Sequence, residues 1–336
     1  MKDWQLSTHA IGVTLAVSTD GRGGWVGTAG VSDRDDASPV APDALFRVGS
    51  ITKTFVAVII LQLVEEGTLD LDDRVRDYVP SYAAGDQVTI RQLLQHTSGL
   101  EDFQPLPEFE EAVIADLNKR WRPIEVLEFV SPEPQFEPGT AWSYSSTGYV
   151  ALGMAMEAAT GNSLSSEIRS RIIEPLSLGS TYLAGHEEGP EGLVRGYDDV
   201  LHVGTLFDLG SIPYTAIETA AWAAGGIVSS AEDLARFAVA LFGGELLTDA
   251  SLDQMLTIVQ LETEPPDWNY GLGLIQFPTD SGPVWGHDGA IPGFDSLFVY
   301  SPRQRVAVVA LTNGNAASNT LIPLLNDALA VISGDD

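Results

Sequence analysis

The feature that most constrains this chain is a serine with a lysine three residues later, at the start of a long apolar stretch. Ser50 and Lys53 open a segment with no further charge before Glu65, which predicts a buried helix over residues 50–66. Positions i and i+3 share one face of a helix, so the amine lies beside the hydroxyl and can help to remove its proton. Ser50 is therefore a candidate nucleophile. Because the chain has only three lysines, composition alone does not explain the pair.

Two later segments supply groups that an acyl-transfer site still needs. Residues 143–149 (SYSSTGY) form a polar turn before the helical run 150–159 and present Tyr144 as a second proton carrier. Residues 286–289 (GHDG) precede an alternating strand, and a glycine at a strand edge lets a substrate lie close to the backbone. A main-chain N–H group there can hold a developing oxyanion. Together these groups predict acyl transfer.

These segments resemble, in content and order, those of the serine β-lactamase and penicillin-binding-protein superfamily, for which the S-x-x-K element is typical. The chain is most similar to the class C β-lactamases and the serine DD-carboxypeptidases. The likeness runs from about residue 10 to residue 330 and includes FRVGSITKTF at 46–55, LLQHTSGL at 93–100 and AGGIVSSAEDL at 224–234. The resemblance therefore covers nearly the whole chain.

The resemblance implies an α/β (α+β) fold, in which an antiparallel sheet is built from both chain ends, is flanked by helices and carries an inserted all-helical lobe. It implies a sheet lobe at 1–49 and 222–336, a mainly helical lobe at 50–221, and an active site in the cleft between them. Alternation at 12–17 and 24–30 indicates an antiparallel hairpin around a turn at 19–22. Helices are expected at 90–95, 108–118, 124–130, 150–159, 164–173, 231–241 and 317–331, and strands at 271–277, 296–300 and 305–312.

The mechanism that the resemblance implies is two-step acyl transfer without a cofactor or metal ion. Ser50 attacks a carbonyl carbon, while Lys53 and Tyr144 share the removal and return of the proton; which of the two is the first base stays open. The backbone N–H groups of Ser50 and Ala290 would hold the oxyanion. Burial in the apolar helix would lower the pKa of Lys53 far enough for it to act as a base near neutral pH.

Departures from the family pattern bear on the substrate. Ser146 stands where an asparagine usually holds the substrate amide, and a serine hydroxyl offers fewer hydrogen bonds. His287, Asp288 and Gly289 form the third motif with Ala290, and threonines usually occupy the second and fourth of these places. An aspartate facing the pocket would repel a substrate carboxylate, which favours a neutral or cationic substrate. An Asp288 side chain turned away from the pocket is the open alternative.

The expected function is that of a serine hydrolase that cleaves esters or amides through an acyl-enzyme, as the esterases and D-aminopeptidases of this family do, with possible weak β-lactamase activity. A DD-carboxypeptidase or a class C-like β-lactamase is the first alternative. A penicillin-binding or sensor protein that acylates without hydrolysing is the second. A small molecule or a short peptide is the expected partner, and a monomer is favoured.

The charge balance is extreme, with 47 acidic against 17 basic residues and a net charge of -30. Such a surface repels nucleic acids and anionic membranes, which excludes them as partners. Acidic residues spread along the chain suit a protein kept soluble in high salt, so we expect a halophilic source; a merely acidic protein from a lysine-poor genome is the alternative.

The remaining signals are weaker. No apolar run reaches the length of a membrane span and the N-terminus is no signal peptide, so the expectation is a soluble protein, cytoplasmic or exported with a leader that this sequence lacks. The absence of cysteine excludes disulfides and thiol catalysis. No cluster of His, Asp and Glu has metal-ligand spacing. His96 stands where a helix ends near a glycine, which favours a capping or core role over catalysis.

Overall fold

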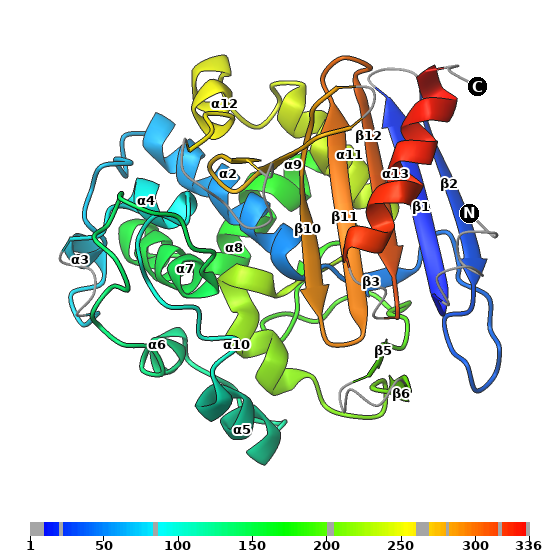
Figure 1. Ribbon diagram of the computed structural model, residues 1–336, viewed down its shortest axis with the longest axis horizontal. Coiled ribbons are helices and arrows are strands. Elements are labelled where there is room, and N and C mark those ends of the chain that lie inside the picture. Colours follow the sequence, from blue (N-terminus) through cyan, green and yellow to red (C-terminus); the bar gives the residue numbers. More distant parts are fainter. Residues whose placement is uncertain are drawn as a thin grey trace.

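The computed structural model describes residues 10–19, 23–82, 87–199, 205–259, 269–279, 282–314 and 318–333. A seven-stranded antiparallel sheet of order β2-β1-β12-β11-β10-β9-β8 forms one side of the molecule (Figure 1). Its strands are β1 Gly12–Thr19, β2 Gly23–Gly30, β8 Asn269–Tyr270, β9 Ile275–Phe277, β10 Val284–Ile291, β11 Phe294–Ser301 and β12 Val306–Thr312. Strand β1 pairs with β12 from Val13 opposite Thr312 to Thr19 opposite Val306. Both chain ends therefore build one sheet, which confirms the predicted arrangement.

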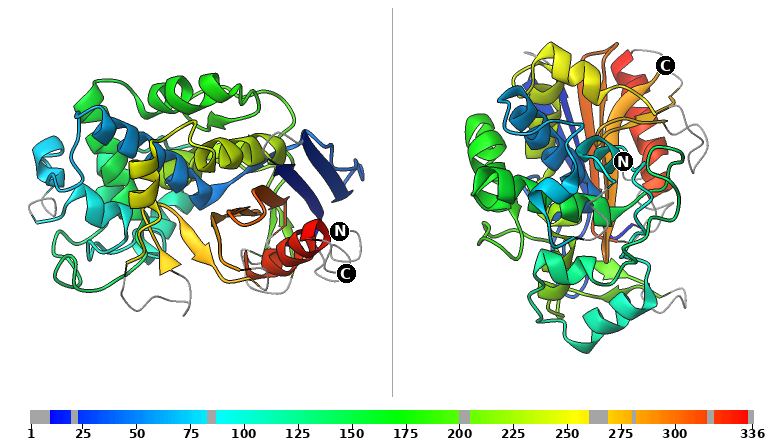
Figure 2. Two further views of the ribbon diagram at one scale, coloured as in Figure 1. Left: turned by 90° about the horizontal axis from the view of Figure 1, so that it is seen from above. Right: turned by 90° about the vertical axis from the view of Figure 1, so that its left-hand side faces the viewer.

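The sheet is buried on both faces because helices cover both. Side chains alternate across a strand, and in β12 Val306, Val308 and Ala310 join one apolar cluster, whereas Val309 and Leu311 join another. Helix α13 (Ser318–Ser333) covers the first face and α11 (Ala231–Phe242) the second, as the two directions of view show (Figures 1 and 2). The continuous apolar run of β12 is thus explained by burial on two sides.

The regular secondary structure between β2 and β8 is mainly helical, as expected. The helices are η1 Gly49–Ile51, α2 Thr52–Glu65, α3 Val75–Tyr78, α4 Ile90–Leu94, α5 Pro107–Ala115, α6 Pro123–Leu127, α7 Ser146–Thr160, α8 Leu164–Ile168, the π-helical turn Arg169–Ile173, α9 Glu174–Leu176, α10 Thr215–Gly225 and α12 Asp249–Met255. Short strands interrupt them: β3 Leu45–Arg47, β4 Tyr182–Leu183 and β7 Ile227–Ser230 form one small sheet, and β5 Tyr197–Asp198 and β6 Phe207–Asp208 form another. Helices joined by loops, with these few short strands, therefore make up the inserted region, and the lobe boundaries given above stay a prediction.

Helix α2 runs through the core, and its residues from Thr52 to Leu61 are all buried. Its apolar sequence fits contact with α7 on one side and α10 on another. The helix begins two residues later than the predicted segment, because Ser50 lies in the 3₁₀ turn η1 that leads into it. Among the described residues, no helix is long and apolar enough to cross a membrane.

The strand expected over residues 271–277 forms only in its second half. Gly273 adopts a φ of +74°, in the left-handed region that glycine tolerates best, so the chain turns there between β8 and β9. A Cβ atom at this position would lie 2.5 Å from the Ala57 side chain of α2. The turn of the hairpin at 20–22 and the first residue of the closing helix, Ala317, lie outside the described residues.

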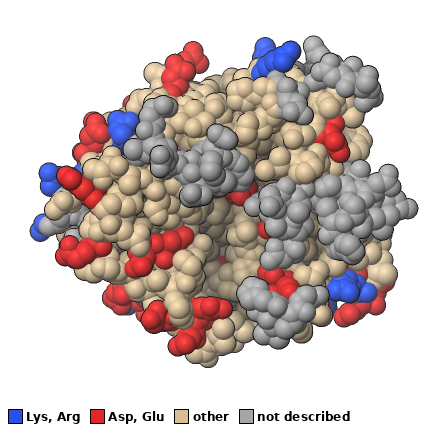
Figure 3. All heavy atoms as spheres, in the orientation of Figure 1, with Lys and Arg blue, Asp and Glu red and all other residues tan. Residues whose placement is uncertain are grey.

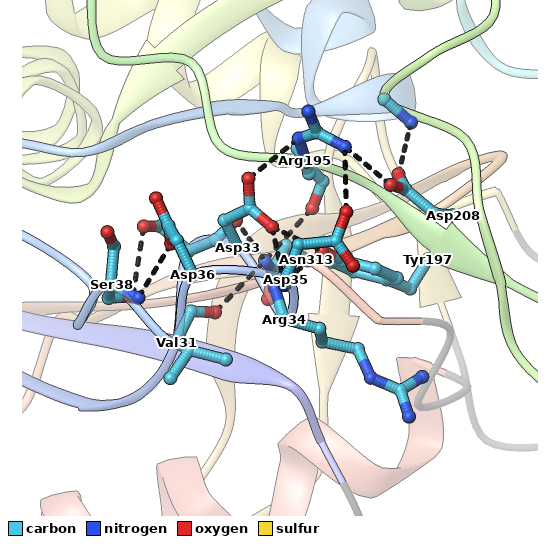
Figure 4. A network of polar contacts seen from close by, with 12 residues as sticks. Val31, Asp33, Arg34, Asp35, Asp36, Ser38, Arg195, Tyr197, Asp208 and Asn313 are labelled. Atoms are coloured by element: carbon cyan, nitrogen blue, oxygen red, sulfur yellow. Dashed lines mark hydrogen bonds and ion pairs between the residues drawn. The ribbon is translucent and has the colours of Figure 1, made fainter.

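The surface is strongly acidic, and the face shown in Figure 3 carries far more acidic than basic side chains. Several of the described arginines form ion pairs, and Arg195 has the richest set (Figure 4). Its guanidinium lies 2.8 Å from Asp33 and 2.6 Å from Asp208. Asp198, in the same hairpin as Asp208, accepts a hydrogen bond of 2.9 Å from the Gly293 N–H in the turn after β10. This hydrogen bond ties the turn after β10 to the small sheet of β5 and β6.

Candidate active site

Ser50 and Lys53 lie together at the start of α2, as their spacing predicts. Lys53 Nζ is 2.9 Å from Ser50 Oγ and donates a second hydrogen bond, of 2.8 Å, to the Ala224 carbonyl at the end of α10. Ser50 is partly exposed, whereas Lys53 is completely buried. The amine is therefore held between a backbone carbonyl and a hydroxyl that solvent can reach.

The environment of Lys53 favours its neutral form. Burial lowers its pKa from 10.5 to about 7, while the negative charges of Asp102 and Asp288 oppose this shift. A group with a pKa near 7 is partly unprotonated at neutral pH, which a general base requires. This agrees with the lowered pKa expected from the apolar sequence around Lys53.

Tyr144 lies beside the same pair, 4.9 Å from Lys53 Nζ to the ring centroid. It directly precedes α7, where Ser145 caps the helix by accepting a hydrogen bond from the Gly148 N–H. Burial raises the pKa of the Tyr144 hydroxyl well above 10, although its hydrogen bond with Ser50 opposes this shift. The phenol therefore keeps its proton at neutral pH and can donate it.

His96 holds the backbone on both sides of Tyr144. Its carbonyl accepts a hydrogen bond from the Ser143 N–H at 2.9 Å, and its Nδ1 accepts one from the Ser145 N–H at 3.0 Å. The imidazole and Tyr144 ring centroids are 4.3 Å apart, and His96 Nε2 has no hydrogen-bond partner among the described residues. The predicted core position is correct, since His96 is 1% exposed, but its contacts go directly to a candidate catalytic residue.

The turn that carries Ser50 packs directly against β10. A Cβ atom at Gly289 would lie 2.1 Å from the Val48 carbonyl oxygen and 2.9 Å from the Ser50 nitrogen. Gly49 has a φ of +48°, and a Cβ there would lie 2.7 Å from the Ala290 oxygen. Only glycines permit this close approach. It places the backbone of Ala290 beside that of Ser50.

A pocket of about 590 Å³ opens over Ser50, and two carboxylates line it, Asp102 and Asp288. The Asp288 side chain is 22% exposed and lies in the pocket wall, so it does not turn away from the pocket. Asp102 accepts a hydrogen bond from the Gln104 N–H, and burial raises its pKa despite the opposing charge of Lys53. No lysine or arginine belongs to the described lining of this pocket.

Two of the predicted substrate-binding residues lie behind the pocket wall and not in it. Ser146 is fully buried and its hydroxyl donates to Gln104 Oε1 at 3.1 Å. His287 is also fully buried, hydrogen-bonds Tyr270 through Nε2 at 2.9 Å, and has its pKa lowered to about 3 by burial and by Lys53. Both side chains support residues that line the pocket, namely Gln104 and Tyr270.

Sequence reasoning missed several lining residues because they come from loops and from a distant strand. These residues are Asp102, Gln104, Pro105, Trp142, Tyr270 and Ile275. It also missed Ser296 of β11, whose hydroxyl lies 2.9 Å from the Val48 carbonyl and 3.1 Å from that of Gly289. A polar residue within the apolar run of β11 was the available signal. Among the described residues, no group of three or more metal-ligating side chains lies together.

Comparisons with known proteins place the chain in a well-populated group. The family model described as beta-lactamase matches residues 3–330. Penicillin-binding protein 4 of Amycolatopsis lactamdurans is 32% identical over 97% of this chain and 87% of its own. A D-stereospecific amidohydrolase from Streptomyces sp. superposes with a TM-score of 0.84 at 33% identity, over 96% of this chain and 95% of the other. A D-amino acid amidase from Ochrobactrum anthropi SV3, in complex with D-phenylalanine, superposes with a TM-score of 0.87 at 30% identity, over 100% and 97%.

Proposed function

Since this chain belongs to the beta-lactamase family and is a serine hydrolase, we propose that it cleaves amides or esters whose acyl half carries a free ammonium group. The observation that carries the proposal is the pair of carboxylates, Asp102 and Asp288, in the wall of the Ser50 pocket. Like charges repel and opposite charges attract strongly where water is partly excluded. The pocket therefore favours an ammonium group over the carboxylate of a β-lactam or a peptide C-terminus.

The reaction starts with the transfer of the Ser50 proton to Lys53, which is the better candidate for the first base. Its pKa of about 7 and the 2.9 Å distance from Nζ to Oγ support this role. Tyr144 cannot act first as a phenolate, because its pKa is well above 10. Ser50 Oγ then attacks the substrate carbonyl carbon, and the oxyanion forms beside the Ser50 and Ala290 N–H groups.

Tyr144 supplies the proton that the leaving amine or alcohol needs. It receives a proton in turn from the Lys53 ammonium through the hydrogen-bonded cluster around Ser50. Water then attacks the acyl-enzyme with the neutral Lys53 amine as base, which releases the acid and restores Ser50.

The relatives support an amide substrate of D configuration, since two of the similar structures are a D-stereospecific amidohydrolase and a D-amino acid amidase. Carboxypeptidase and β-lactamase activities are proposed to be minor, because their substrates bring a carboxylate towards Asp288. The acidic surface supports a high-salt environment.

A substrate panel tests the proposal. It compares 4-nitroanilides of D- and L-amino acids, their N-acetylated forms, a short nitrophenyl ester, a chromogenic cephalosporin and a D-Ala-D-Ala peptide. We expect the free D-amino anilides to have the highest kcat/KM and N-acetylation to lower it about tenfold, the effect of losing roughly 1.4 kcal/mol of charge attraction. Asp102→Asn and Asp288→Thr should each reduce the difference in kcat/KM between the free and the N-acetylated anilides. A preference for the carboxylate substrates would reject the proposal.

The nucleophile is tested separately. Ser50→Ala should abolish hydrolysis of every substrate, and a fluorophosphonate should add one adduct to the wild-type chain, at Ser50. An adduct on another residue would show that the assignment of the nucleophile is wrong.

A further inference from the structure

We propose that a second, apolar cavity beside the Ser50 pocket binds a long apolar side chain on the acyl half of the substrate; this inference rests on the proposed function. The cavity has a volume of about 510 Å³, within the range of about 300–1,000 Å³ typical of small-molecule sites. Of its fifteen lining residues, thirteen are apolar, and only Gln104 and Glu110 are not. It lies between α5, the start of α10 and the turn after β10.

The cavity adjoins the catalytic pocket. Gln104 and Ala290 line both spaces, and Ala290 carries one of the backbone N–H groups proposed to hold the oxyanion. A substrate carbonyl held there therefore has one substituent at the entrance of the apolar cavity.

The position of Tyr144 decides which half of the substrate enters. The leaving group must lie near Tyr144, because that hydroxyl supplies its proton. Tyr144, Trp142 and Tyr270 line the first pocket only, whereas the second cavity opens past Ala290. The acyl half therefore extends into the apolar cavity, and the leaving group stays with the aromatic residues.

The walls indicate the chemistry of the occupant. Ile114 of α5 lines the cavity and is 66% exposed, one of few large apolar side chains so open to water in the described part of the chain. Such exposure is unfavourable and is relieved when an apolar group covers it. Asp102 and Asp288 belong to the first pocket alone. The preferred acyl half thus combines an ammonium group near these carboxylates with a large aliphatic or aromatic side chain.

The test uses nitrophenyl acetate, butyrate, hexanoate and octanoate, which carry no ammonium group and so report on the cavity alone. Each methylene buried should raise kcat/KM about fourfold, and the rise from acetate to hexanoate should be on the order of 10²-fold after correction for reactivity with hydroxide. The same trend is expected from D-alanine to D-leucine to D-phenylalanine anilides. A flat profile would overturn the proposal.

Two variants make the cavity less able to hold an apolar group, and a third serves as a control. Ile217→Trp fills it from α10 and Val113→Asp makes its α5 wall polar, so both should reduce the hexanoate-to-acetate ratio at least tenfold. Ile322→Trp alters a partly buried isoleucine of α13 in the other apolar cluster and should leave the ratio unchanged. An unchanged ratio in Ile217→Trp would also overturn the proposal.

The apolar subsite stays testable even if none of these neutral esters is turned over, because binding can be measured without turnover; the proposed function is judged separately, by the anilide panel. In the Ser50→Ala variant, hexanamide should raise the melting temperature more than acetamide at equal concentration, because ligands of the folded state stabilise it in proportion to their affinity. Ile217→Trp in the same background should remove the difference. Equal effects of the two amides would reject the apolar subsite.

Discussion

At the scale of single residues, the balance of charges around Lys53 sets the pH at which the base is available. Burial lowers the pKa of Lys53 to about 7, and Asp102 and Asp288 both raise it. The amine must be unprotonated to act as base, so kcat/KM should rise with pH through an inflection near 7.

Removing either carboxylate changes that inflection in a defined direction. Asp102→Asn and Asp288→Asn each delete a negative charge that favours the ammonium form, so the pKa of Lys53 should fall. The acidic limb of the kcat/KM profile should therefore move to lower pH, measured with a neutral nitrophenyl ester to avoid changes in substrate affinity. A shift to higher pH would contradict the assignment of Lys53 as base.

His96 should act as a positioning residue for Tyr144. His96→Phe keeps a ring against Tyr144 but removes the acceptor of the Ser145 N–H, whereas His96→Asn keeps an acceptor and loses the ring. We expect His96→Phe to lower kcat at least tenfold with little change in KM, and His96→Asn to recover part of kcat. Phe237→Leu, a core change that leaves the contacts of His96 and Tyr144 in place, is the control for lost stability. Equal losses of kcat in all three variants would indicate a purely structural role.

At the scale of elements, a largely buried ion pair joins β3, the strand before Ser50, to α10, the helix whose Ala224 carbonyl accepts a hydrogen bond from Lys53. Arg47 of β3 lies 2.7 Å from Glu218 of α10, and its guanidinium carbon lies 3.7 Å from the Tyr214 ring centroid. Trp222, further along α10, has a φ of +36°, and this kink precedes the Ala224 carbonyl that binds Lys53. The position of the Lys53 amine therefore depends on the packing of α10.

Removing one partner of this pair should lower the stability of the protein by more than the intact pair contributes to it, because the other charge stays buried without a partner. Glu218→Ala leaves Arg47 buried without its partner and should lower the free energy of unfolding by about 3 kcal/mol in urea titrations, while the double change Arg47→Met with Glu218→Leu should recover most of it. Glu232→Ala breaks an exposed pair with Arg236 and should change stability by less than about 1 kcal/mol. A similar loss in both single variants would show that burial of the Arg47 pair is not what matters.

The predictable parts of this molecule are those fixed by local spacing. Ser50 and Lys53 are neighbours because helix geometry places them so, and the order of apolar runs gave the sheet from both chain ends. Asp102 and Tyr270 reach the pocket through tertiary packing, for which their own segments carry no signal. The misread half of the strand at 271–277 has the alternation of a strand, but close packing of Gly273 against α2 forces a turn.

At the scale of the whole molecule, the net charge of -30 should control how stability depends on salt. The 17 basic residues neutralise 17 of the 47 negative charges, which leaves an excess of 30 negative charges on the molecule. Their mutual repulsion extends over a Debye length of about 30 Å at 0.01 M salt and about 3 Å at 1 M. Salt also weakens attractive pairs such as those of Arg195, but these are close and partly buried, so screening affects them less.

The melting temperature and the activity should therefore both rise from low to molar NaCl or KCl. Part of the rise above about 1 M reflects strengthened apolar burial, which any protein shares. A neutral osmolyte such as sucrose strengthens apolar burial without screening charge. The rise in melting temperature in a chloride salt beyond the rise in sucrose therefore measures the relief of charge repulsion. That excess should appear mainly below about 0.5 M, where the Debye length shortens most. A melting temperature that stays flat from 0.05 to 2 M salt would reject the high-salt adaptation and leave the catalytic assignments unchanged.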